Sequence, residues 1–179
     1  MPQSTPIEDI CRQLSVILEG DDDDVFRNMA IPKDDIYGDL FDWYCGCKEK
    51  DYSELHSFYA YIGDSVCGHV AIGKAKPHTF APHSPSLARG DVCAVLCLVV
   101  KKSLRGGPAG GTGGVGQFLM DAAFSEAAAL GMPQSSTYVL WVYEENTGAQ
   151  RFYKRFGFAD TSIRRKRDDG TSSQLWQRG

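Results

Sequence analysis

The stretch VCAVLCLVV at residues 92–100 constrains the fold most strongly, together with the glycines and the helical pattern that come after it. It is apolar at every position, which predicts a central strand buried on both faces. Glycines crowd residues 106–116, and the spacing of apolar residues over 115–131 predicts a helix. This order is typical of phosphate binding, because backbone N–H groups at a helix N-terminus attract anions. One face of the helix is predicted to carry Val115, Phe118, Leu119, Ala122 and Ala123.

Chain length and hydropathy predict one domain without a membrane segment. The 179 residues, 42% of them apolar, suffice for a single well-buried core, so we expect one domain over residues 1–179. No apolar run approaches the ~18 residues needed to cross a bilayer. The first residues lack the basic-then-apolar order of a secretory signal, which predicts a cytoplasmic protein with no membrane partner.

Charge and cysteine spacing narrow the classes of ligand. A net charge of -4 provides no broad basic field, which argues against a nucleic-acid partner and suits a small cationic substrate. The six cysteines show no CxxC pair or regular frame, so we expect reduced thiols and no metal site. Cys45 and Cys47 are the only close pair, and we interpret them as a surface feature.

The remaining periodicity predicts an alternation of helices and strands without an internal repeat. The predicted elements are a helix over 7–18, a helical region over 35–48, a hairpin over 56–75 turned at Gly63-Asp64, an irregular loop over 77–90, a strand over 137–143, a helix over 146–156 stopped by Gly157, and a closing hairpin over 158–178.

The glycine loop contains the spacing G-x-G-x-x-G in Gly111, Gly113 and Gly116. A nicotinamide-binding domain needs these glycines directly after its strand and further strand–helix units afterwards. Here residues 101–110 intervene, and the chain ends in a hairpin. A P-loop is excluded because Gln117 and Phe118 stand where lysine and serine or threonine are required. The diphosphate of another cofactor therefore remains the candidate ligand of the glycine loop.

A second motif specifies that cofactor. The pattern L-x-V-x-x-x-N-x-x-A-x-x-x-Y-x-x-x-G-F is met in full, and G-x-G at the helix start follows an arginine and a glycine. Residues 92–158 therefore resemble the acetyl-CoA-binding half of the GNAT superfamily of N-acetyltransferases. The glycine loop is longer than the family pattern, and Lys102 replaces its proline. The matching residues of the pattern are Leu140, Val142, Asn146, Ala149, Tyr153, Gly157 and Phe158.

The resemblance implies an α/β (α+β) fold with a mixed, mostly antiparallel central sheet flanked by helices. It implies a splay between two parallel central strands, with acetyl-CoA as co-substrate and no metal. Asn146 would bind the pantetheine arm unless it only caps the helix. The implied cofactor-binding residues are Leu98, Val99, Val100, Arg105, Gly111, Thr112, Gly113, Gly114, Val115, Gly116, Asn146 and Tyr153.

Two residues are predicted to be catalytic. The resemblance makes Tyr153 the acid that protonates the leaving thiolate, although it could simply pack with neighbouring aromatic side chains. The amine must lose a proton before it attacks, and Asp91 is a candidate base unless it only caps a turn. His69, His78 and His83 are further candidates, each with a structural alternative.

We therefore predict an N-acetyltransferase that transfers acetyl directly from acetyl-CoA to a primary amine of a small molecule. The alternatives are a protein lysine or N-terminal acetyltransferase and a non-catalytic acyl-CoA-binding module. A homodimer is left open.

Overall fold

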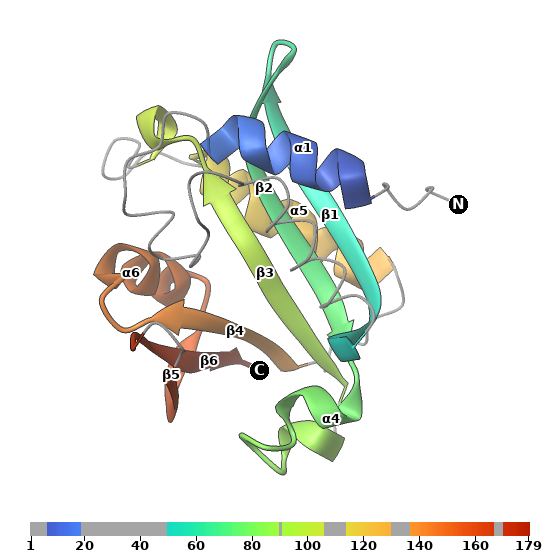
Figure 1. The fold of residues 1–179 in the computed structure, drawn as a ribbon, viewed down its shortest axis with the longest axis vertical. Coiled ribbons are helices and arrows are strands. Elements are labelled where there is room, and N and C mark those ends of the chain that lie inside the picture. Colours follow the sequence, from blue (N-terminus) through green and yellow to red (C-terminus); the bar gives the residue numbers. More distant parts are fainter. Residues whose placement is uncertain (1–6, 19–49, 90, 106–113, 130–136, 167–169) are drawn as a thin grey trace.

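The computed structural model describes residues 7–18, 50–89, 91–105, 114–129, 137–166 and 170–179 (Figure 1). These ranges form a six-stranded sheet of order β1-β2-β3-β4-β6-β5. Only β3 and β4 pair in parallel; the other neighbours are antiparallel. This confirms the predicted mixed, mostly antiparallel sheet. The strands are β1 (Tyr52–Ile62), β2 (Ser65–Ala75), β3 (Val92–Val100), β4 (Thr137–Tyr143), β5 (Ala159–Lys166) and β6 (Ser172–Arg178).

Helices lie on both faces of the sheet. In Figure 1, α1 crosses the front of β1 and β2, and α5 lies behind them. Ring contacts of Phe124 with Phe156, at 6.3 Å between centroids, bring α6 beside α5. These helices therefore enclose the sheet around its central strands. The helices are α1 (Ile7–Leu18), α4 (Pro77–Phe80), α5 (Val115–Ala129) and α6 (Thr147–Arg155).

Most local predictions are confirmed. The first hairpin turns at Gly63, whose φ of 58° lies in the left-handed region that glycine adopts without strain. Its strands extend to Tyr52, further than predicted. Cys11, Cys67, Cys93 and Cys97 take part in no disulfide in the structure. The predicted helical region over 35–48, the close pair Cys45 and Cys47, and any strand before α1 lie outside the described residues.

The predicted buried face of α5 is wrong at one position. Phe118 is 61% exposed, whereas Leu119, Met120, Ala123 and Ala127 are fully buried. The helix lies very close to β2 at Gly68, where a Cβ would be 2.8 Å from Leu119 Cδ1. The buried residues of α5 are therefore those that face the sheet, and Phe118 points away from the sheet.

The predicted irregular loop over 77–90 is in part helical. Pro77 starts the single turn of α4, because its fixed φ suits the first helical position. A 3₁₀ turn follows at Leu87–Arg89. Phe80 and Leu87 are almost fully buried and pack with Val92 and Leu175. The segment is thus a packed connection that delivers the chain to the start of β3.

Candidate active site

The central feature is a gap between β3 and β4. The strands pair at Val92–Thr137, Cys93–Tyr138 and Ala94–Val139, and the described residues contain no pair beyond these. Both strands nevertheless continue, to Val100 and Tyr143, and diverge in Figure 1. The predicted splay is confirmed. Unpaired edges of two strands can accept an extended ligand in place of a strand.

A β-bulge interrupts β3 within this gap. Ala71 pairs with Leu96 and His69 with Val99, so two residues of β3, Cys97 and Leu98, lie opposite one residue of β2. Cys97 has a φ of 47°, in the left-handed region that non-glycine residues rarely adopt. The bulge therefore turns the chain at the point where β3 leaves β4.

Beyond the bulge, backbone groups alternate between the two edges of β3. Lys101 N–H donates to Cys67 O of β2 at 2.9 Å. By alternation, the amide of Val100 faces the gap and that of Val99 faces β2, whereas Leu98 lies within the bulge, where regular alternation is interrupted. Of the predicted backbone contacts, the Val100 amide is thus directed to the gap and the Val99 amide is not, and the Leu98 contact remains a prediction.

Arg105 lies at the open end of the gap. The short 3₁₀ turn Lys102–Leu104 reverses the chain after β3. The Arg105 Nε–H then donates to Val100 O at 2.6 Å. The exposed guanidinium is therefore held beside the last residue of β3, close to where the ligand would leave the gap.

The N-terminus of α5 lies at the same end. Gly114 O accepts from Gln117 N–H at 2.9 Å, so Gly114 is the residue before the first turn. A Cβ on exposed Gly114 would meet no described atom within 4 Å. At Gly116 a Cβ would be 3.2 Å from Phe152 of α6 and 3.7 Å from Val100 of β3. Helix α5 thus begins against both elements; Gly111, Thr112 and Gly113 lie outside the described residues.

Tyr153 approaches the gap from α6. Burial raises the pKa of its phenol, and the Cys97 thiol raises this pKa further. Its side chain packs against the core cluster that includes Val95 of β3 and Leu140 of β4. Its ring also contacts Phe152 and Phe158, at 5.5 and 6.0 Å between centroids. Tyr153 is therefore both a packing residue and a neutral O–H donor at pH 7.

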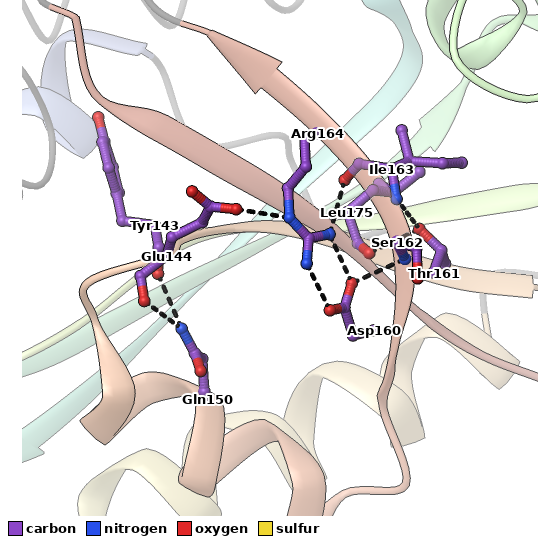
Figure 2. Close-up of polar contacts among 9 residues, drawn as sticks. All are labelled: Tyr143, Glu144, Gln150, Asp160, Thr161, Ser162, Ile163, Arg164 and Leu175. Atoms are coloured by element: carbon purple, nitrogen blue, oxygen red, sulfur yellow. Dashed lines mark hydrogen bonds and ion pairs between the residues drawn. The ribbon is translucent and has the colours of Figure 1, made fainter.

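The turn from β4 to α6 is held by side chains (Figure 2). Asn146 caps α6, its Oδ1 accepting from Ala149 N–H at 3.0 Å. Gln150 Nε2 donates to the carbonyls of Tyr143 and Glu144, at 3.1 and 2.8 Å. The capping alternative for Asn146 is thus observed, and its amide N–H₂ remains available as a donor.

An ion cluster ties this turn to β5. Figure 2 shows Arg164 between Glu144 and Asp160, bonded to the first through Nε and to the second through Nη1 and Nη2. Arg164 holds the pKa of Asp160 below its ordinary value. Glu144 is therefore part of the support of α6.

Asp91 lies at the opposite, closed end of the gap. Its carbonyl accepts from Thr137 N–H at 3.0 Å, and its carboxylate lies 3.8 Å from Lys74 Nζ. Along an extended strand, Asp91 and Leu98 are separated by roughly 20 Å. The structure therefore does not bring Asp91 together with Tyr153, and its role as a base remains a prediction.

The three candidate histidines lie apart. His78 Nε2 is 2.8 Å from Lys50 O at the surface. His83 packs edge-on against Trp141, at 5.0 Å between centroids, and burial followed by the charge of Arg165 lowers its pKa. His69 is fully buried beside the bulge.

Two residues at the gap were not predicted. Cys97 is the bulge residue with the left-handed φ. The sequence gives no signal for it, because such positions are usually occupied by glycine and this one is a cysteine. Trp141 lies on the diverging part of β4, with the Arg165 guanidinium 4.4 Å from its ring centroid. Its place two residues beyond Val139, the last residue of β4 that pairs with β3, follows only from the strand pairing.

Metal sites and membrane spans are both absent from the described residues. Across those ranges, no three or more His, Cys, Asp or Glu residues are grouped to hold a metal ion. Among the helices in the same ranges, none has the length and apolar composition needed to span a membrane.

Comparison with protein families gives a clear match. Residues 23–158 match the family described as "Acetyltransferase (GNAT) family". A comparison with curated proteins returned no match.

Solved structures share the fold at low sequence identity. Ribosomal-protein-alanine N-acetyltransferase from Brucella melitensis superposes with a TM-score of 0.62 at 16% identity, over 97% of this chain and 96% of that chain. PH1933 from Pyrococcus horikoshii OT3 gives 0.57 at 20% identity, over 91% and 88%. Arabidopsis thaliana Naa50, in complex with the bisubstrate analogue CoA-Ac-MVNAL, gives 0.50 at 19% identity, over 69% and 72%.

Proposed function

This chain belongs to the GNAT family of acetyltransferases, and we propose that it transfers acetyl from acetyl-CoA directly to a primary amine of a small molecule. The observation that carries the proposal is the gap between β3 and β4, with Tyr153 near its bulge and the start of α5 at its open end. One site thus combines room for a thioester arm, a proton donor and an anion-binding helix end.

The start of α5 suits the diphosphate of CoA. Backbone N–H groups of the first turn point out of the helix and attract anions. A Cβ at Gly114 would meet no atom of the described residues within 4 Å, and the Arg105 cation lies beside the end of β3. Leu98 and Val100 would pair with the pantetheine arm through their backbone groups, and Asn146 would donate its amide hydrogens.

The proposed chemistry assigns one task to each group. The neutral amine attacks the thioester carbonyl carbon, a C–N bond forms, and the C–S bond breaks. Leu98 N–H stabilises the negative charge that develops on the carbonyl oxygen. Tyr153 donates its proton to the departing sulfur, and solvent takes the proton that the amine releases and reprotonates the tyrosine. The products are an acetamide and free CoA thiol.

Burial of Tyr153 supports this role. A raised pKa keeps the phenol protonated at neutral pH, so that the proton is present when the thiolate departs. The side chain is half-buried, so solvent can also reprotonate it. Asp91 takes no part in this scheme.

The acceptor class has two candidates. The net charge of -4 favours a small cationic amine. A protein N-terminus is the second candidate, because similar folds include a ribosomal-protein-alanine N-acetyltransferase and a structure bound to a peptide-containing bisubstrate analogue.

An acceptor panel tests the proposal. Release of free CoA thiol from acetyl-CoA is measured with polyamines, amino acids, amino sugars and peptides that have free N-termini. Amine-dependent thiol release, with the acetylated product seen by mass spectrometry, is the expected result. CoA binding without transfer to any amine would favour the non-catalytic module, and absence of both binding and transfer would refute the proposal.

A further inference from the structure

We propose that His69 is a positioning residue: its hydrogen bond to the Cys97 carbonyl holds the β3 bulge so that the Leu98 amide faces the thioester carbonyl. The inference rests on the proposed function, because it concerns how the same gap is prepared for acetyl transfer. It assigns a task to a buried polar side chain that takes no direct part in the proposed reaction.

The contacts of His69 determine its tautomer. Its Nδ1 lies 2.9 Å from Cys97 O, and its Nε2 lies 3.2 Å from Ser57 Oγ. A carbonyl oxygen only accepts, so Nδ1 carries the hydrogen. In a neutral ring Nε2 is then the acceptor for the Ser57 hydroxyl. The ring thus connects β1, β2 and β3 through directed hydrogen bonds.

The bulge needs such support. A non-glycine residue with a left-handed φ, as at Cys97, costs of order 1 kcal/mol or more and persists only where its surroundings enforce it. The His69 N–H reaches the carbonyl of this strained residue. A donor at this position favours the turned peptide over a regular strand.

The turned peptide lies next to both proposed reactive groups. Leu98, whose amide is the proposed donor to the thioester carbonyl, directly follows Cys97 in the chain. The Cys97 thiol is close enough to the Tyr153 phenol to raise the pKa of that phenol. Displacement of Cys97 would therefore move the backbone donor and disturb the surroundings of the acid.

The same geometry excludes His69 as the base that accepts the amine proton. The side chain has no exposed surface, and its Nε2 is occupied by Ser57. Burial also lowers its pKa to about 4, against an ordinary value of 6.5, so the ring is neutral near pH 7. The proposed contribution of His69 is to orient the backbone of the β3 bulge.

Two matched variants distinguish the two hydrogen bonds that the His69 ring makes. In His69→Asn the amide nitrogen is as many bonds from Cβ as Nδ1 and can donate to Cys97 O. In His69→Gln it is as many bonds from Cβ as Nε2 and reaches towards Ser57 instead. Both variants lose the ring, so a purely structural role predicts similar effects on catalysis.

The first readout needs no acceptor amine. Acetyl-CoA labelled with ¹³C at the acetyl carbonyl is bound to the protein, and isotope-edited infrared spectroscopy measures the thioester band. We expect the band of the wild-type complex at a lower frequency than that of free acetyl-CoA, because a hydrogen bond polarises the carbonyl. His69→Asn should keep most of this shift and His69→Gln should lose most of it.

Turnover and affinity complete the test. On an amine identified by the panel, His69→Gln should lower kcat at least about tenfold, and His69→Asn less than about threefold. Calorimetry should give CoA affinities within about threefold of wild type for both, since the diphosphate contacts are unchanged. Ser57→Ala, which leaves the Cys97 bond intact, should retain the band shift even if His69→Gln fails to fold.

Equal band shifts in His69→Asn and His69→Gln, or loss of the shift in Ser57→Ala, would overturn the positioning role. A wild-type protein that shows neither heat of CoA binding nor a bound carbonyl band would instead refute the proposed function. The two failures are therefore distinguishable.

Discussion

At the scale of single residues, Tyr153 shows how packing and chemistry coincide. Its ring belongs to an aromatic group with Phe152 and Phe158, and its phenol reaches the environment of Cys97. Packing fixes the ring, and the fixed ring presents the phenol at the diverging part of β3. The two interpretations that the sequence left open are therefore compatible.

Replacing Tyr153 tests the acid role. Tyr153→Phe keeps the ring contacts and removes the proton donor, so kcat should fall about 100-fold while CoA affinity changes little. Steady-state kinetics and calorimetry measure the two quantities. Tyr138→Phe is the matched control, because Tyr138 lies on β4 at the closed end of the gap, paired with Cys93. An unchanged rate in Tyr153→Phe would remove the acid from the scheme.

At the scale of elements, two glycines at the start of α5 have different tasks. Gly116 makes room for Phe152, which packs α6 against the helix start. Gly114 lies in front of the first turn, and a Cβ there would meet no described atom within 4 Å. The first is needed for packing within the fold, and the second is where the proposed ligand would approach.

Charge at Gly114 tests the diphosphate assignment. Gly114→Asp should weaken CoA binding at least about tenfold, because like charges that face each other cost several kcal/mol. It should not lower the melting temperature, since Asp is a favourable residue before the first turn of a helix.

Gly114→Asn provides the control for this change. It has nearly the same shape and capping ability without the charge. Calorimetry should therefore show a much smaller loss of CoA affinity for Gly114→Asn than for Gly114→Asp. Equal affinities of Gly114→Asp and the wild-type protein would contradict the assignment of the α5 start.

At the scale of the whole molecule, the sheet contains a buried polar link between its strands. His69 on β2 bonds Ser57 of β1 and Cys97 of β3. Helix α1 crosses this face, with Cys11 and Ile17 almost fully buried. A proton added to His69 would thus place a charge inside the packed fold, where burial disfavours it.

Stability should therefore fall with acid. The pKa of His69 is about 4 in the folded protein and 6.5 ordinarily, so the unfolded chain binds the proton first as pH falls. Stability from this group is complete above pH 6.5 and is lost as the pH falls to about 4, by about 3 kcal/mol. Urea unfolding at several pH values measures this loss. His69→Asn, which cannot titrate, should show a flatter profile, and parallel profiles would contradict the prediction.

Local signals in the sequence were sufficient for most of the described elements, although not for α4 and the 3₁₀ turn Leu87–Arg89. The apolar run at 92–100, the glycine turn at 63 and the capping asparagine at 146 predicted β3, the first hairpin and the start of α6, because each depends on short-range geometry. The family motif, which spans adjacent elements, also predicted the splay between parallel strands.

The sequence by itself determined which elements form and which family they build, since periodicity, turns and caps act between residues close in the chain. Only the tertiary structure decided that Phe118 is exposed, that Asp91 lies far from Tyr153, and that His69 bonds Cys97. These outcomes depend on which strands pair and where a bulge falls. Such contacts join residues distant in the chain, and no local pattern encodes them.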